Sequence, residues 1–278
     1  MAFRRWQVGL EIGNGTLRAL AVQRRRQGWC LRHWWQKRLP GGEQGLPPPG
    51  ADEMLAHWRS ALPGSISLRV CLADLLIRQG RIDAPDRRLR EPERGWYVVS
   101  RASRHFSDDG YPLAFDYQDD PRVPSALLVT AARQSVVDAW QNCLRDAGLK
   151  PQVLDIMPCA LRAMAGHAGL ERDRPLVHRI GDGWCWVSPL DSPLAFGFAD
   201  RADTADFTAW QRSMAGTLSS TAHTVRHPAY VSSVERAPLP EAAAPWPPFE
   251  KLWRVYPPAP PWPEAFVIAG GLAIRQED

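Results

Sequence analysis

The chain has 278 residues, of which 45% are hydrophobic and 23% are charged, a composition typical of folded globular proteins rather than disordered or fibrous ones. No apolar run approaches the roughly 18 to 20 residues of a membrane span, and basic residues 1–5 lead into a strand pattern without the apolar segment of a signal peptide. The net charge of +4 is modest, and the five cysteines are widely spaced with no C-x-x-C pair, so we expect a cytoplasmic protein with reduced thiols.

The first predicted element is a hairpin with a glycine-rich turn. An apolar strand at 8–12 leads into Gly13-Asn14-Gly15, and a second strand at 16–22 follows at once. Glycine and asparagine tolerate positive φ, so the turn can reverse the chain and leave backbone N–H groups pointing into the loop. In proteins of the actin, Hsp70 and sugar-kinase superfamily such a hairpin cradles phosphate, and Glu11 stands where a carboxylate helps to organise the metal. The same pattern also fits an ordinary hairpin that binds nothing.

The following elements alternate between strands and helices up to about residue 170. We expect strands at 29–38, 67–72, 77–82, 113–117, 126–130 and 153–156, with 67–72 pairing with 77–82. Helices are predicted at 52–62, 91–106, 131–147 and 159–167, because their apolar residues recur at helical spacing. This order indicates an α/β chain.

The last hundred residues are predicted to form a β-meander at 176–180, 184–187 and 194–198, a helix at 202–219 and a weak strand at 230–233. Residues 237–263 are rich in proline and contain Trp246, Trp253 and Trp262. This stretch fits either a polyproline II ligand or a surface connection that covers part of the second half. Residues 265–275 form an apolar strand or helix.

Other candidate sites are weak. His223 and His227 have the spacing of two zinc ligands on a helix, but Pro228 follows directly and no third ligand is evident. The carboxylate pairs at 108–109 and 119–120 stand beside Gly110 and Pro121 and are typical of solvated turns. The arginine runs at 24–26 and 87–90 could meet an anionic surface, although each fits a solvated face when taken singly.

Several later segments resemble the PilM family of type IV pilus assembly proteins. They are S-A-L-L-V-T-A-A-R at 125–133, the helix ending in A-G-L at 147–149, and the corner V-L-D-I-M-P-C-A-L-R at 153–162. Asp116-Tyr117 is similar to the D-Y pair of that family, and G-L-A-I-R at 271–275 is similar to its closing motif. Within the family the enterobacterial HofM group, tied to DNA utilisation, is the most similar. The resemblance covers most of 8–163 and the C-terminal segment, and residues 200–263 do not align.

The resemblance implies an actin-like α/β fold of two ribonuclease-H-like halves. Residues 1–170 would form the first half, with an inserted α+β subdomain at about 67–150. Residues 171–278 would form a reduced second half that includes the Pro/Trp-rich stretch at 237–263. About a hundred residues after Leu176 are too few for two further subdomains of ordinary size.

The resemblance also identifies a departure from the superfamily's nucleotide site. Its second phosphate motif is D-x-G, whereas this chain has Arg179-Ile180-Gly181. A guanidinium in place of a metal-organising carboxylate reverses the local charge, which argues against Mg-dependent hydrolysis although it leaves direct phosphate contact open. We therefore expect degenerate phosphate loops without a metal, made of Glu11, Gly13, Asn14, Gly15, Thr16, Arg179 and Gly181.

The resemblance implies a non-catalytic cytoplasmic scaffold, peripheral to the inner membrane, in a type IV pilus or DNA-uptake complex. It would bind the N-terminal tail of a single-span PilN/HofN-like protein in a groove between the first subdomain and the insertion. The alternative is a nucleotide-binding ATPase or sugar-kinase-like enzyme that uses ATP and Mg at the Gly13–Gly15 loop. Direct nucleic-acid binding would rest on mild basicity alone and is not expected. The 13 tryptophans exceed what the core needs, so we expect some to be exposed at an interface.

Overall fold

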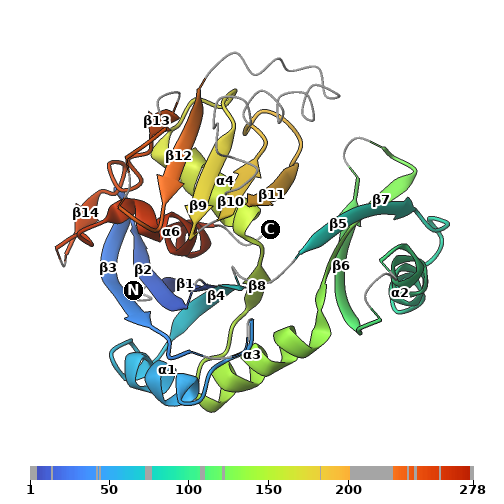
Figure 1. The fold of residues 1–278 in the computed structure, drawn as a ribbon, viewed down its shortest axis with the longest axis horizontal. Helices are drawn as coiled ribbons and strands as arrows, with labels where there is room; N and C mark the ends of the chain where they lie inside the picture. Colours follow the sequence, from blue (N-terminus) through green and yellow to red (C-terminus); the bar gives the residue numbers. More distant parts are fainter. Residues whose placement is uncertain are drawn as a thin grey trace.

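A computed structural model describes residues 5–13, 15–41, 43, 45–72, 77–106, 110–120, 123–181, 183–200, 228–236, 238–240, 243–256 and 258–275. Across these residues the chain forms three sheets, of six, five and three strands, with helices between and beside them (Figure 1). The two larger sheets form the main body, and the small sheet lies to one side of it.

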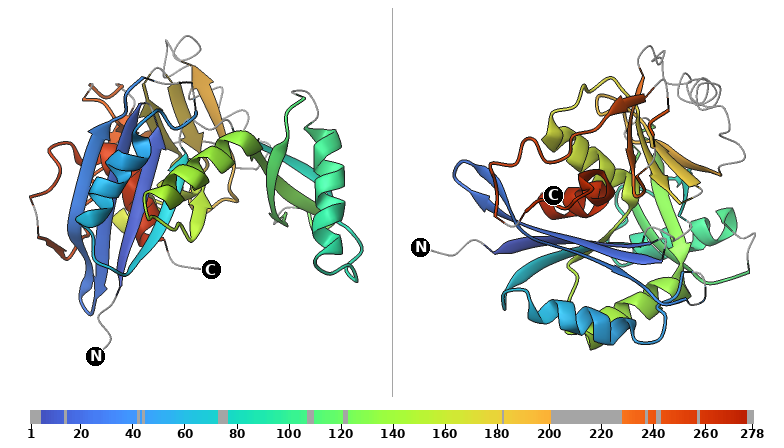
Figure 2. Two further views of the ribbon diagram at one scale, coloured as in Figure 1. Left: turned by 90° about the horizontal axis from the view of Figure 1, so that it is seen from below. Right: turned by 60° about the vertical axis from the view of Figure 1, so that its left-hand side comes forward.

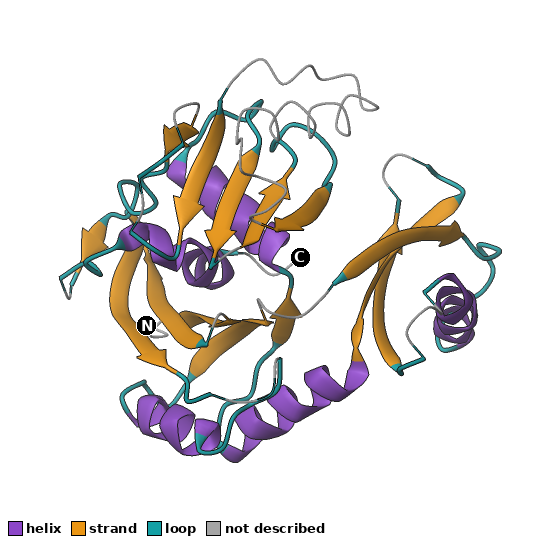
Figure 3. Cartoon of the chain, in the orientation of Figure 1, coloured by secondary structure: helices purple, strands orange, loops and turns teal. Residues whose placement is uncertain are grey.

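The first sheet has the order β14-β3-β2-β1-β4-β8. Strands β1, β2 and β3 form an antiparallel meander, and β4 and β8 continue the sheet in parallel from β1. Helices α1 and α3 cover one face and bury apolar side chains against it (Figure 3). The bounds of these elements are β1 Trp6–Gly13, β2 Thr16–Arg25, β3 Gly28–Arg38, α1 Ala51–Ser60, β4 Ile66–Leu72, α3 Gln134–Asp146, β8 Val153–Asp155 and β14 Arg254–Val255.

The second sheet has the order β11-β10-β9-β12-β13, and helices α4 and α6 pack between it and the first sheet (Figure 2). All eight residues of α6 are buried because the helix lies between two sheets. Its close approach requires glycine: a Cβ on Gly271 would lie 1.9 Å from the carbonyl oxygen of Ala160 in α4. The bounds are α4 Met157–Ala168, β9 Leu176–Ile180, β10 Gly183–Val187, β11 Phe196–Asp200, β12 Ala229–Ser233, β13 Ala243–Pro245, the 3₁₀ turn η3 Pro263–Phe266 and α6 Val267–Ile274.

The small sheet has the order β5-β7-β6, with α2 packed on one face. Alternate residues of β7 pack against α2, namely Leu127, Val129 and Ala131, so Leu128, Thr130 and Ala132 point to the other face. The bounds are β5 Arg78–Asp83, α2 Glu93–His105, β6 Leu113–Asp119 and β7 Ala126–Arg133.

One predicted strand pairing is wrong. Strand β4 pairs with β1 and β8, and β5 pairs with β7. The physical reason lies in burial: all seven residues of β4 are buried, as in the middle of a parallel sheet, whereas β5 is largely half-exposed. The small sheet therefore consists of β5, β6 and β7, with α2 packed on it. Strand β4 belongs to the first sheet, and α3 packs on that sheet.

Two further details differ from expectation. Asp120 is buried and pairs with Arg81, so only Asp119 of that carboxylate pair is exposed, where it accepts a 2.9 Å ion pair from Arg94. The chain at 265–275 is helical. The expected helix at 202–219, the histidine pair at 223 and 227 and the carboxylates at 108–109 lie outside the described residues.

The predicted thiols are all free in the structure, and four of the five are buried. Among the helices that the structure describes, none is long and apolar enough to cross a membrane.

The Pro/Trp-rich stretch connects the two larger sheets. Its strand β13 pairs with β12, Trp246 is buried in the core between the sheets, and β14 pairs with β3. The indole N–H of Trp262 donates to the carbonyl of Ser233 at 2.8 Å. The described part of the stretch is thus a surface connection, anchored by the buried Trp246 and by the strand pairing of the exposed β14 with β3.

Candidate functional site

The two strands that flank the predicted first phosphate loop contain a buried ion pair. Glu11 on β1 lies directly opposite Arg18 on β2, and Arg18 Nη1 lies 3.2 Å from Glu11 Oε1. The side chains are 1% and 4% exposed, respectively. The carboxylate that the resemblance assigns to metal organisation is therefore already bound by a guanidinium inside the protein.

A histidine from the second sheet lies near this pair. His178 on β9 is fully buried, and its Nδ1 lies 2.8 Å from Ser232 Oγ on β12. Burial, together with the smaller effect of the positive charge of Arg18, lowers the pKa of His178 to about 3. A neutral imidazole is thus held at the place where the two sheets face each other.

The first predicted loop borders a cavity of about 420 Å³, whose lining includes neither Arg179 nor Gly181 of the second predicted loop. It is lined from the first sheet by Gly15, Thr16, Arg18, Gln36 and Arg38, and from the end of β12 by Val234 and Glu235. Glu235 also lies 3.9 Å from the guanidinium of Arg179.

The structure places the remaining predicted site residues as follows. Arg179 Nε donates to the carbonyl of Gly181 at 3.3 Å, so this side chain folds back on its own turn. Gly13 ends β1 opposite Thr16, Gly15 has φ of +60°, and Asn14 lies outside the described residues. The cations near the loops are thus arginines, and two of them, Arg18 and Arg179, lie next to the carboxylates of Glu11 and Glu235.

These residues do not fit a magnesium ion. Mg²⁺ is bound through one or two carboxylates together with water and substrate phosphates. Here Glu11 is buried against Arg18, and Glu235 faces Arg179. Among the described residues no group of three or more His, Cys, Asp or Glu side chains could hold a metal.

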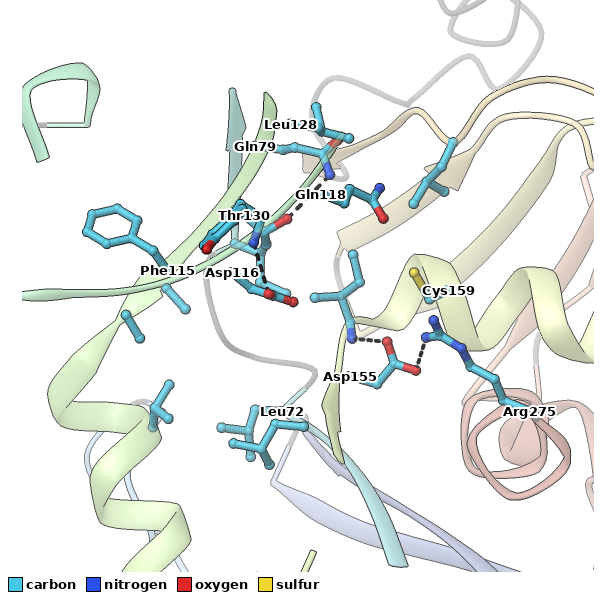
Figure 4. A pocket seen from close by; sticks show the side chains of 18 residues that line it. Leu72, Gln79, Phe115, Asp116, Gln118, Leu128, Thr130, Asp155, Cys159 and Arg275 are labelled. Atoms are coloured by element: carbon cyan, nitrogen blue, oxygen red, sulfur yellow. Dashed lines mark hydrogen bonds and ion pairs between the residues drawn. The ribbon is translucent and has the colours of Figure 1, made fainter. Parts of the chain in front are cut away.

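A second cavity, of about 300 Å³, opens between the small sheet and the main body (Figure 4). We call it the groove. One wall is the face of the small sheet away from α2, with Ala114, Leu128 and Ala132 among its residues. The other wall consists of the ends of β4 and β8, the start of α4, and Leu194, with Leu72, Leu154 and Ile156 among its residues.

Strand β6 contributes five consecutive residues to the groove, 114–118. Side chains alternate between the two faces of a strand, so a run of five lining residues includes backbone as well as side chains. Among the strands that the structure describes, β6 pairs only with β7, which makes it an edge strand of the small sheet. The groove therefore offers both an apolar floor and a strand edge.

The polar groups of the groove are few. Asp155 is held by an ion pair with Arg275 and by the backbone N–H of Ile156, which donates to Oδ1 at 2.8 Å. Asp116 accepts the backbone N–H of Tyr117 at 2.9 Å and is exposed. Asp155 is thus neutralised by a described cation, and Asp116 has no described cation beside it.

The sequence motifs of the resemblance meet at this groove. Asp116 and Tyr117 of the D-Y pair, Asp155 of the strand-to-helix corner and Arg275 of the closing motif all line it. Sequence reasoning named these residues without joining them. It missed Gln79 and Thr130, whose side chains lie 3.4 Å apart across β5 and β7, because their only local signal is strand alternation.

Three comparisons with known proteins bear on this geometry. No protein-family model matches the chain. The DNA utilization protein HofM of Escherichia coli (strain K12) is 29% identical over 140 residues, covering 48% of this chain and 52% of HofM. The chain thus spans about half the length of the relative it matches.

Two solved structures share the fold. A PilM–PilN type IV pilus biogenesis complex matches with a TM-score of 0.66 and 20% identity, covering 97% of this chain and 98% of that one. The cytoplasmic domain of EpsL, an inner-membrane component of the type II secretion system of Vibrio cholerae, matches with a TM-score of 0.53 and 13% identity, covering 98% and 95%. The resemblance to PilM and HofM is therefore confirmed, and so is the actin-like α/β fold that it implied.

Proposed function

We propose that this protein is a non-catalytic scaffold of an inner-membrane complex of the type IV pilus or DNA-uptake kind. In this proposal it lies on the cytoplasmic side of the membrane and binds the N-terminal tail of a single-span PilN/HofN-like protein. Residues 1–170 and 171–278 would be the two actin-like halves. The observation that carries the proposal is the groove between the small sheet and the first sheet.

The shape and lining of the groove suit an extended peptide. An apolar floor provides pockets for alternate side chains, and the edge strand β6 provides main-chain partners, which together are the features of peptide binding by strand addition. Because Asp155 is neutralised by Arg275 and Asp116 faces no described cation, a tail with apolar residues and one basic residue would complement the groove.

The fold relatives support the same class of role. HofM is a DNA utilization protein, EpsL is a component of a type II secretion system, and the PilM structure is that of a type IV pilus biogenesis complex with PilN. A PilN-like partner for this chain is the extension that we propose from it.

The alternative of a nucleotide-dependent enzyme is the weaker proposal. It would need Glu11 to organise a metal, and Glu11 is buried against Arg18. We propose that the predicted loop residues form a degenerate phosphate site that has become part of the core between the sheets.

A calorimetric titration tests the peptide proposal. The titrant is a synthetic peptide of the N-terminal cytoplasmic tail of a PilN/HofN-like protein from the same organism. The variant Thr130→Arg places a long cation on the floor of the groove, and we expect it to weaken binding at least about tenfold by filling the space and adding charge. The matched control is Ser100→Arg, on the exposed face of α2 on the opposite side of the same small sheet.

The outcomes separate the two functions. Peptide binding without added nucleotide, lost in Thr130→Arg and kept in Ser100→Arg, supports the scaffold. Equal peptide affinity in both variants contradicts the groove as the binding site. A titration with ATP and magnesium that gives clear heat at micromolar concentration would favour the enzyme instead.

A further inference from the structure

A basic and aromatic surface lies at the edge of the first sheet farthest from the groove. It is formed by the β2–β3 turn, the start of β3 and the strand β14, which projects from the body on the side away from the small sheet (Figures 1 and 2). We call it the edge patch and define it by Arg24, Arg25, Arg26, Arg32, Trp253, Arg254, Val255 and Tyr256.

The charge of the edge patch is one-sided. It contains five arginines, and none of them forms an ion pair with a carboxylate in the part of the chain that the structure describes. Four of them, all except Arg32, are exposed. Since guanidinium groups remain charged at every physiological pH, the patch carries an uncompensated positive field.

The arginines are interleaved with aromatic rings. Arg32 lies 4.3 Å from the ring centre of Tyr256 and 5.5 Å from that of Trp6, and Arg254 lies 4.9 Å from Trp253. Arg24 lies 5.2 Å from the ring of Trp29. Each described ring in this surface therefore already has a guanidinium against it.

The projecting strand is fixed by backbone contacts rather than by burial of its side chains. The N–H of Trp253 donates to the carbonyl of Trp29 at 2.8 Å, and the N–H of Tyr256 donates to that of Leu31 at 3.2 Å. The side chains stay in solvent: Trp253 and Val255 are each 40% exposed and Tyr256 is 51% exposed. A well-held segment thus presents apolar and aromatic groups outward between cations.

We infer that the edge patch binds the surface of an anionic lipid bilayer. Arginines attract anionic head groups, and tryptophan and tyrosine are favoured at the depth of the head groups, where one end of the side chain is apolar and the other wet. The exposed apolar side chain of Val255 can enter a bilayer surface, whereas it would add nothing to the binding of a polyanion such as a nucleic acid. The rings are also covered by guanidinium groups, which makes them poor platforms for stacking nucleic-acid bases.

The edge patch is independent of the peptide groove. In the first sheet β14 and β8 stand at opposite ends of the strand order, and the groove is lined by β8. The proposal of lipid binding and the proposal of tail binding therefore concern different surfaces, and either can be contradicted without the other.

Vesicle co-sedimentation of the full chain tests the inference. Vesicles of phosphatidylcholine alone are compared with vesicles that contain phosphatidylglycerol, with no peptide present. The variant Arg24→Gln/Arg25→Gln/Arg26→Gln removes three positive charges from the patch. Each basic residue near an anionic surface contributes about fivefold in partitioning, so we expect a loss on the order of 100-fold. The matched control is Arg87→Gln/Arg88→Gln/Arg90→Gln. It removes the same number of charges from the connection between β5 and α2, away from the edge patch.

A second variant, Trp253→Ala/Tyr256→Ala, tests the aromatic contribution and should weaken binding at unchanged net charge. Binding to anionic vesicles only, lost in the patch variants and kept in the control, supports the inference. It is overturned if the native chain does not sediment with anionic vesicles, or if the two arginine variants lose binding equally. Tight binding of a fluorescent single-stranded oligonucleotide without vesicle binding would also overturn it, in favour of nucleic acid.

Discussion

Removal of one partner from the buried Glu11–Arg18 pair should destabilise the protein strongly. In Glu11→Gln the guanidinium of Arg18 keeps its charge inside the protein, with only 4% of its side chain exposed. Leaving one ion of a buried pair uncompensated costs about 3 to 5 kcal/mol. At roughly 2 to 4 °C per kcal/mol for a chain of this size, we expect the melting temperature to fall by about 6 to 20 °C.

The double variant Glu11→Gln/Arg18→Met should recover much of this loss, because it removes both charges together. Urea unfolding of the native chain, each single variant and the double variant gives the coupling energy, which we expect to be at least about 2 kcal/mol. The control is Glu235→Gln, the same chemical change in a pair whose carboxylate is half-exposed and 3.9 Å from Arg179, with an expected cost below about 1 kcal/mol.

Two results would refute this reasoning. Additive effects of Glu11→Gln and Arg18→Met, within about 0.5 kcal/mol, would mean that the pair does not act as a unit. A rise in the melting temperature of the native chain on addition of magnesium and ATP would mean that Glu11 remains available to a metal.

Two further predictions concern buried groups. The pKa of His178 lies near 3 when folded and near 6.5 when unfolded, so the native state binds fewer protons between these values and loses stability as the pH falls. From pH 7 to pH 5 this group should lower the free energy of unfolding, measured in urea, by about 2 kcal/mol. The variant His178→Gln should abolish this loss, and the control His57→Gln, at an exposed histidine, should retain it. The same pH profile in His178→Gln as in the native chain would contradict the prediction. Gly271→Ala should lower the unfolding free energy by about 1 to 3 kcal/mol or more, because the added methyl meets α4 backbone at 1.9 Å, whereas Gly166→Ala on the exposed side of α4 should stabilise slightly; equal melting temperatures would refute the steric argument.

The elements of this fold were largely readable from local patterns, but their partners were not. The opening hairpin and the helices follow from glycine turns and apolar periodicity, which are properties of short windows. The pairing of β4 with β1 across a long separation depends on the whole sheet, so adjacency in sequence suggested β5 instead.

The candidate site was readable to a similar degree. Asp116, Asp155 and Arg275 stood out through family motifs, and their meeting in one groove required the fold. The hairpin register places Glu11 opposite Arg18, a pairing that was not predicted from the sequence, and the approach of His178 from the second sheet has no local signal.

If both proposed contacts hold, their positions set a minimum length for the bound tail. The edge patch and the groove lie at opposite ends of a six-stranded sheet, and five strand spacings of about 4.8 Å give about 24 Å. An extended chain spans at most about 3.3 to 3.6 Å per residue, so a tail needs roughly seven residues between the bilayer and the groove-binding segment.

A series of lipid-anchored tail peptides with increasing spacers tests this on anionic vesicles. Spacers longer than about seven residues should let both contacts form at once and raise the apparent affinity by about 100-fold or more, because the second contact becomes intramolecular. Shorter spacers should give no such gain. The triple glutamine variant at Arg24, Arg25 and Arg26 should show no gain in affinity at any spacer length. If the native chain gains as much with the shortest spacer as with the longest, the edge patch and the groove are not separated along the sheet as inferred.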